Sequence, residues 1–254
     1  MTGFRIIPCL LLSNGGLVKT EKFRDPKYVG DPINAIRIFN EKEVDELFVI
    51  DIDASGKNHE PDFDLIDQLA SECFMPLGYG GGIKSLDQAK RLFDIGIEKI
   101  TLQSALATNP KLLGQIVDLF GSQAVVASID VKKDWLGRRK LFSKFGTKFP
   151  QARWQDFMVS VVEEGAGEVL LNSVDLDGTR RGMDLQMVEE AAKLVDVPVT
   201  AIGGVGSLQD FKAARDAGAS AAAAGAFFVL QGTHRAVLIS YPRRQEILDL
   251  WRKP

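Results

Sequence analysis

Short apolar runs alternate with amphipathic helical patterns along the whole chain. The apolar runs have the length of buried strands, and the stretches between them carry apolar residues at helical spacing. In one such stretch Ser85 is placed to cap a helix in which Leu86, Ala89, Leu92 and Phe93 share one face. This alternation is typical of βα units that build a parallel sheet. The predicted strands are Arg5–Leu12, Glu46–Ile52, Phe74–Leu77, Lys99–Leu102, Ala124–Ile129, Glu168–Leu171, Val197–Ile202 and Ala219–Gly225.

The second half of the chain repeats the first half at a constant offset. The segment Gly81–Leu86 corresponds to Gly203–Leu208, and the same register holds without a gap on both sides. It pairs Asp53 with Asp175, Asp62 with Asp184, Pro76 with Pro198 and Gly96 with Gly218. A period this long contains several strand–helix units. The pattern predicts an α/β protein, a single (β/α)₈ TIM barrel domain over residues 1–254 with half-barrels at roughly 1–122 and 123–254. An open doubly wound sheet is the alternative, but it does not predict a repeat that closes on itself.

Composition excludes several classes of protein. The net charge is −3 and the pI is about 5.6, so no global basic field attracts nucleic acid or membranes. The sequence has no membrane-spanning apolar run and no signal-peptide pattern at its start, so we expect a cytoplasmic protein. The two cysteines, Cys9 and Cys73, lack metal-ligand spacing and are expected to be buried thiols. With only two histidines as well, we expect neither a metal site nor a cofactor.

Basic and aromatic residues are interleaved in Lys132–Pro150. Such a mixture can indicate nucleic-acid binding. The alternation across Arg139–Phe145 favours a hairpin with a solvated face, inserted after the fifth strand at the mouth of the barrel. A basic loop at that place can guide a phosphorylated substrate.

Candidate site residues lie at the carboxyl ends of the predicted strands, where the active sites of such barrels gather. Each repeated glycine segment lies between a strand and a helix start, an arrangement that can cradle a phosphate. The two cradles suit a substrate with a phosphate at each end, or one of them is a remnant of duplication. Asp130 ends a strand and is either a general acid or base or a loop-capping carboxylate. The remaining candidates are Leu11, Lys19, Asp51, Asp53, Gly80–Gly82, Gln103, Ser104, Asn172, Asp175, Asp177, Gly203, Gly204, Ala224 and Gly225.

Four charged residues stand at the opposite ends of the strands: Arg5, Glu46, Lys99 and Glu168. Charges at strand starts usually face solvent and support stability. Two of each sign on four strands can instead form a salt-bridged ring that closes the bore. The pattern alone favours the solvent-facing interpretation.

Eight segments, spread over nearly the whole chain, carry a family resemblance: Arg5–Leu10, Asp31–Pro32, Asp45–Leu47, Tyr79–Ile83, Phe120–Gln123, Ser128–Asp130, Gly165–Glu168 and Asp175–Thr179. They closely resemble the cyclase subunit of imidazole glycerol phosphate synthase. The resemblance implies a two-fold barrel that binds a bis-phosphorylated substrate and receives ammonia through its bore from a glutaminase docked on the N-terminal face. It also implies that the four charged residues form the ammonia gate. No glutaminase nucleophile motif is present in this chain.

The family uses two catalytic aspartates, and the chain departs from it at the first. The second aspartate matches Asp130, but Leu11 stands where the first should be. Leucine cannot exchange a proton, so two-carboxylate chemistry should be crippled. Gln103 replaces the usual asparagine of the phosphate shell, and Leu176 replaces an arginine. The substrate- and phosphate-binding residues that the resemblance implies are Lys19, Gly81, Gly82, Gln103, Ser104, Asp177, Gly203, Gly204, Ala224 and Gly225.

A divergent branch of the family is more similar still. In that branch a cyclase-like barrel and a glutaminase supply ammonia to an ATP-dependent sugar amidotransferase, which makes acetamidino sugars for surface polysaccharides. The shared segments are Pro8–Leu12, Asn14–Thr20, Phe39–Glu46, Ser71–Pro76 and Gln231–Pro242. We expect the last of these segments to be an apolar run that replaces the usual final helix of the family. The resemblance therefore favours an ammonia-conducting subunit. A true cyclase of histidine biosynthesis and a non-catalytic scaffold are the alternatives.

Overall fold

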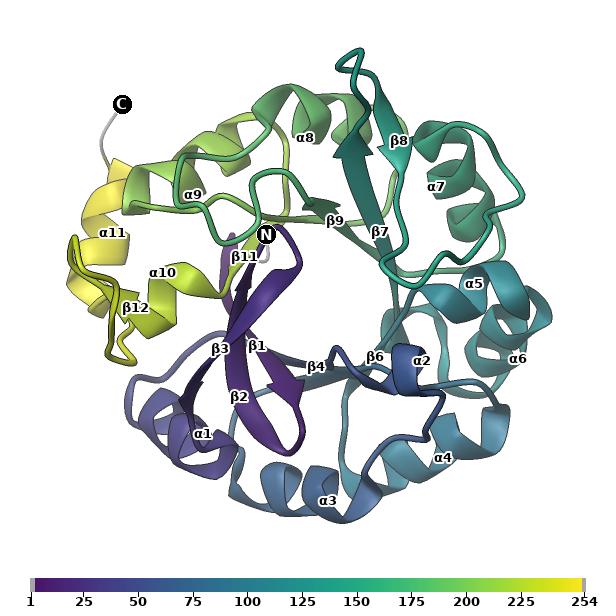
Figure 1. Ribbon diagram of the computed structural model, residues 1–254, viewed down its shortest axis with the longest axis horizontal. Coiled ribbons are helices and arrows are strands. Elements are labelled where there is room, and N and C mark those ends of the chain that lie inside the picture. The colour runs from purple at the N-terminus through teal and green to yellow at the C-terminus, as the bar shows by residue number, and fades with distance from the viewer. Residues whose placement is uncertain (1–2, 253–254) are drawn as a thin grey trace.

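Eight parallel strands close into a barrel in this computed structural model, which describes residues 3–252. Each strand pairs with the next along the chain, and the last pairs with the first through Arg5 and Ala221 (Figure 1). This closure confirms the predicted (β/α)₈ TIM barrel and excludes an open sheet. The barrel strands are β1 (Arg5–Ser13), β4 (Leu47–Asp51), β5 (Leu77–Gly80), β6 (Lys99–Leu102), β7 (Val125–Lys133), β9 (Glu168–Ser173), β10 (Val199–Ile202) and β11 (Ala221–Ala224).

Helices surround the barrel as an outer layer (Figure 1). They are α1 (Pro32–Glu41), α3 (Phe63–Glu72), α4 (Leu86–Ile95), α6 (Lys111–Phe120), α7 (Trp154–Glu163), α8 (Leu185–Ala192), α9 (Leu208–Asp216) and α11 (Arg244–Arg252). Shorter helical turns are α2 (Ala54–Lys57), α5 (Ser104–Thr108), the 3₁₀ turn η1 (Ser122–Ala124) and α10 (Ala226–Val229). Within the described residues, none of these helices has the length and apolar character needed to cross a bilayer.

Residues paired by the internal repeat have the same structural roles. Asp62 and Asp184 each cap a helix by accepting a backbone N–H, from Leu65 and from Met187. The carbonyls of Pro76 and Pro198 accept hydrogen bonds of 2.9 Å from the strand residues Leu47 and Val169. Asp53 accepts a hydrogen bond from the backbone N–H of Asn14, the residue after β1. Asp175 accepts one from the backbone N–H of Lys133, the last residue of β7. The sequence repeat is therefore also a repeat of local structure.

Two hairpins extend from the carboxyl ends of barrel strands. The hairpin predicted after the fifth strand is confirmed, because β8 (Arg139–Leu141) pairs antiparallel with β7, although the strand ends before Phe142. The sequence did not predict the other hairpin, in which β2 (Gly16–Glu21) and β3 (Arg24–Gly30) follow β1.

Two sequence-based predictions were wrong in detail. The third strand is Leu77–Gly80 and not Phe74–Leu77, because two glycines form part of the strand and Phe74 is 87% exposed in the preceding loop. The segment Gln231–Pro242 does not replace the final helix. It contains a small hairpin of β12 (Leu230–Gln231) and β13 (Ala236–Val237), and α11 follows it.

Candidate functional site

A cavity of about 500 Å³ lies at the carboxyl ends of the barrel strands. Most of the candidates predicted from sequence line it: Leu11, Lys19, Asp51, Gly80–Gly82, Gln103, Ser104, Asp130, Asn172, Asp177 and Gly225. Asp53, Asp175, Gly203, Gly204 and Ala224 do not line it. The structure therefore gathers one glycine cradle and the candidate carboxylates around one space.

Asp130 is buried on β7 and faces this cavity. Gln103 Nε2 donates to its Oδ2 at 2.7 Å, and Asn172 Nδ2 donates to its Oδ1 at 3.1 Å. Burial raises the pKa of Asp130 to about 7, and the negative charge of Asp177 acts in the same direction. The hydrogen bond from Asn172 opposes this shift. A carboxyl group with a pKa near neutrality can both donate and accept a proton at physiological pH.

Leu11 lines the cavity from β1, beside Ile50 of β4 in the parallel register. Its side chain adds apolar surface where a second catalytic carboxylate would stand. Asp177 does not replace that carboxylate, because its Oδ1 pairs with Lys19 Nζ at 3.0 Å and Oδ2 accepts from Thr20 Oγ1 at 3.3 Å. Cys9 is no substitute nucleophile, since burial raises the pKa of its thiol to about 12. Asp130 is thus a proton-exchanging side chain of the cavity that is not held in an ion pair.

The two glycine cradles differ in their access to the cavity. Gly81 adopts a φ of +116°, and a Cβ there would lie 2.4 Å from the carbonyl oxygen of Asp51, so only glycine fits. Lys84, Ser104 and Lys144 line the cavity together with this cradle. In the second cradle Gly204 accepts a backbone hydrogen bond of 2.9 Å from Gly182. The loop after β9 therefore packs against the second cradle, while the first opens to the cavity beside cationic and hydroxyl groups.

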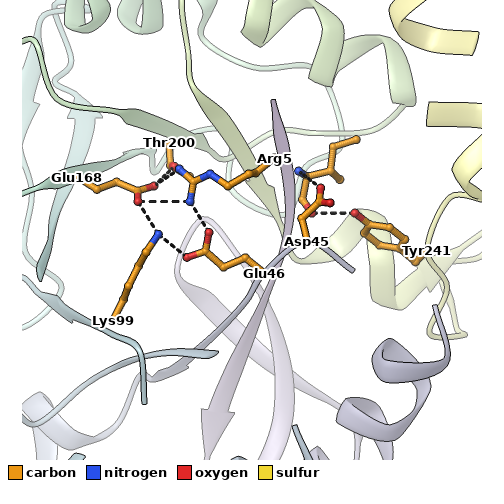
Figure 2. Close-up of polar contacts among 8 residues, drawn as sticks. Arg5, Asp45, Glu46, Lys99, Glu168, Thr200 and Tyr241 are labelled. Atoms are coloured by element: carbon orange, nitrogen blue, oxygen red, sulfur yellow. Dashed lines mark hydrogen bonds and ion pairs between the residues drawn. The ribbon is translucent and has the colours of Figure 1, made fainter. Parts of the chain in front are cut away.

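The four charged residues at the other end of the barrel form a closed ring of ion pairs. Figure 2 shows the Arg5 guanidinium and the Lys99 ammonium between the carboxylates of Glu46 and Glu168. Lys99 Nζ lies 2.8 Å from Glu46 and 2.9 Å from Glu168, and Thr200 also donates to Glu168. The two glutamates are only 3% and 5% exposed, so the solvent-facing interpretation was wrong. Side chains that meet across a barrel cannot be distinguished from outward-facing ones by a single charge per strand.

The ion pairs control the charge of Glu168. Its burial alone would raise the pKa, but the cations of Arg5 and Lys99 and the hydroxyl of Thr200 hold the pKa below its usual range. Glu168 therefore stays ionised at neutral pH although it is buried.

The sequence analysis did not single out Phe23, an aromatic residue that lines the cavity. Phe23, in the turn between β2 and β3, packs edge to face against Phe142 with ring centroids 5.9 Å apart. Phe23 lines the cavity, and the backbone N–H of Phe142 donates to the carbonyl of Asp130. The signal that could have located Phe23 is the polar turn Glu21–Asp25 between two strand-like runs. Within residues 3–252, no group of three or more His, Cys, Asp or Glu side chains is arranged to hold a metal ion.

The sequence matches the family described as histidine biosynthesis protein over residues 5–234. It is 52% identical to the "Putative imidazole glycerol phosphate synthase subunit hisF2" of Pseudomonas aeruginosa over 239 residues, which cover 94% of this chain and 95% of the relative. The "Putative imidazole glycerol phosphate synthase subunit HisF" of Leptospira interrogans is 50% identical over 95% of this chain and 96% of its own length. The imidazole glycerol phosphate synthase subunit HisF of Exiguobacterium sibiricum is 39% identical over 88% of this chain and 90% of its own.

Proposed function

This chain belongs to the HisF family of histidine biosynthesis proteins, and we propose that it is the ammonia-receiving subunit of a glutamine-dependent amidotransferase. A separate glutaminase subunit docks on the N-terminal face of the barrel and releases ammonia at the ring of Arg5, Glu46, Lys99 and Glu168. The ammonia then passes through the bore to the cavity at the carboxyl ends of the strands. The final acceptor is an acetamido sugar, which a third, ATP-dependent enzyme converts to an acetamidino sugar.

One contrast within the barrel carries this proposal. The ion-pair ring at the entrance is complete, whereas the cavity at the exit has Leu11 in place of a second carboxylate. Ring closure and cleavage of a bis-phosphorylated substrate need two proton-exchanging groups, and Leu11 stands where the resemblance places the first of them, with Asp130 as the second. A barrel with a complete ion-pair ring at its entrance and one catalytic carboxylate missing at its exit suits the delivery of ammonia to another protein.

The interior residues support the passage of ammonia. Above the ring, an apolar cluster of the interior wall includes Ile7, Cys9, Val126 and Leu170. An apolar wall offers no hydrogen bonds that would retain a neutral molecule, and it disfavours ammonium because burial of an unpaired charge is costly. At the upper end, the near-neutral pKa of Asp130 suits a group that hydrogen-bonds arriving ammonia without trapping it as a permanent ion pair.

Stimulation of the glutaminase tests the proposal. We expect the rate of glutamine hydrolysis by the cognate glutaminase to rise when this chain is added in stoichiometric amount. Lys99→Met should separate hydrolysis from product formation, because it opens the ring without touching the cavity. A glutaminase whose rate is unchanged by addition of the chain would rule out the proposed partnership. A non-catalytic scaffold would tolerate Lys99→Met with no loss of product.

A second candidate function is the cyclase reaction of histidine biosynthesis. Asp130, the buried Lys19–Asp177 pair and the open first cradle favour it. Growth of a cyclase-deficient histidine auxotroph on this chain would establish it. Failure of the native chain together with growth on Leu11→Asp would show that position 11 accounts for the loss.

A further inference from the structure

Strands β4 and β5 contribute very differently to the interior of the barrel. Phe48 and Ile50 of β4 pair in register with Gly78 and Gly80 of β5, so two bulky side chains lie next to two positions that have none. Phe48 is completely buried and belongs to the interior apolar cluster with Ile7. It is the largest side chain of that cluster.

The Phe48 ring lies directly over the backbone of Gly78. A Cβ at Gly78 would be 2.4 Å from both Cδ1 and Cε1 of Phe48, and the three nearest heavy atoms all belong to this ring. The backbone of Gly78 is not in the left-handed region, so its conformation would accept alanine. The glycine is required at this place by the aromatic ring and not by a turn.

This pair lies between the two ends of the bore. Along β4 and the residue before it, Glu46 belongs to the ion-pair ring, Phe48 follows one interior position higher, and Ile50 lines the upper cavity. The cavity reaches Cys9, Ile50 and Leu170, but Phe48 and Ile7 are not part of its lining. An apolar layer that includes Phe48 therefore separates the charged ring from the cavity.

We propose that Phe48 is an apolar gate between the ion-pair ring and the upper cavity, and that Gly78 provides the recess into which its ring fits. The inference rests on the proposed function and names the step that makes the bore selective. The gate passes ammonia as a neutral molecule and holds back water and ammonium.

The selectivity follows from the surroundings of the ring. Hydrophobic constrictions exclude water by dewetting, and an ion that enters one loses its hydration without gaining a partner. Phe48 belongs to an interior cluster that also includes Ala221 and Ala223, whose side chains provide no polar atoms to an ion. Because β5 has no side chain at position 78, the Phe48 ring can lie against the wall of the barrel and does not need to occupy the barrel axis.

Alanine at position 78 tests the gate, because its Cβ would force the Phe48 ring toward the axis. The full complex of this chain, its glutaminase and the acceptor enzyme is supplied with glutamine labelled with nitrogen-15 in the amide, in the presence of unlabelled ammonium. We expect Gly78→Ala to lose glutamine-derived nitrogen from the product. Product formation from ammonium alone should be unchanged, because that ammonia enters from the mouth of the cavity. Stimulation of the glutaminase should also be unchanged.

A double variant separates the gate from general damage to the fold. Phe48→Ala in the Gly78→Ala background removes the displaced ring and should restore labelled nitrogen in the product. Gly114→Ala, on α6 where no atom lies within 4 Å of the added Cβ, is the matched control and should behave like the wild type.

Three results would overturn the gate. If Gly78→Ala transfers labelled nitrogen as efficiently as the wild type, the gate is wrong while the proposed function stands. If Gly78→Ala loses transfer and the double variant does not regain it, Phe48 is not the obstacle. If the wild-type complex itself transfers no labelled nitrogen, the proposed function fails and the gate fails with it.

Discussion

The side-chain amide of Gln103 donates a hydrogen bond of 2.7 Å to the carboxylate of Asp130. The family resemblance led us to expect Gln103 in a phosphate shell, yet its amide nitrogen also lies 3.4 Å from the carbonyl of Phe142. The chain segment that carries Gln103 continues into Ser104, which lines the cavity with the first cradle. Gln103 thus positions the carboxyl group of Asp130, while its neighbour Ser104 lines the cavity with the first cradle.

Asp130 should make the stability of the protein depend on pH. Its pKa is about 7 in the folded protein and about 3.9 in the unfolded chain. The unfolded state therefore gives up its proton first, and the free energy of unfolding falls as pH rises from about 4 to about 7. Asp130→Asn removes this titration, so its melting temperature relative to the wild type should increase across that window and stay constant above it.

Thermal melts at a series of pH values measure this difference. The exposed variant Asp118→Asn is the control and should follow the wild-type profile. In Asp130→Asn the remaining side-chain oxygen can still accept the hydrogen bond that Asn172 Nδ2 donates to Asp130 Oδ1 in the wild type. Parallel profiles for Asp130→Asn and the wild type would show that the pKa of Asp130 is the same in the folded and the unfolded protein, and would contradict the prediction.

Leu11→Asp should restore cyclase chemistry if the rest of the site is competent. General acid–base catalysis contributes about 10²–10⁴-fold to a rate, so a gain of this order in turnover of the bis-phosphorylated substrate with ammonium is expected. Leu11→Asn has a similar size but cannot exchange a proton, and it should give no gain. Leu11→Asp should also be less stable than the wild type, because its carboxylate in the cavity is repelled by that of Asp130. Equal turnover by the aspartate and asparagine variants would exclude proton transfer at position 11.

The sequence predicted the barrel because its strands are apolar runs separated by amphipathic helices, and the internal repeat fixed the order of the units. It could not place β5, since Gly78 and Gly80 have low strand propensity and the apolar run Phe74–Leu77 was the stronger pattern. The strand is held there by its neighbours, through the pairs with β4 and β6, and not by its own preference.

The candidate site was predictable where function demands a rare pattern. The glycine cradle and Asp130 could be located because both follow predicted strands, and the carboxyl ends of the strands meet at one end of such a barrel. The ring of Arg5, Glu46, Lys99 and Glu168 was not predictable from pattern alone, because each charge looks solvent-facing until the barrel closes. The packing of Phe48 on Gly78 is also a property of two strands in register, which neither segment shows by itself.

The ring should be far more sensitive to neutralisation than a surface ion pair. Glu168→Gln leaves Arg5 and Lys99 without one of their carboxylates in a buried position, and we expect a loss of about 3 kcal/mol in the free energy of unfolding. Glu189→Gln removes one partner of the exposed ion pair with Lys193 and should cost less than about 0.5 kcal/mol. Chemical denaturation measures both. A similar cost for the two variants would show that the ring has no structural role.

Neutralisation of Lys144 should weaken the binding of inorganic phosphate to the cavity. Lys144 lines the cavity together with Gly82 and Ser104, whereas Lys140, in the same basic segment, is exposed on β8 and lies outside the lining. If the first cradle holds a phosphate, Lys144→Met removes one charge-assisted contact and should raise the dissociation constant about tenfold. Lys140→Met retains the cradle and its cations and should bind phosphate like the wild type. Calorimetric titration at low and moderate ionic strength gives the constants. Equal losses for the two lysine variants would mean that the segment attracts phosphate only through its overall charge, and that the cradle does not bind it.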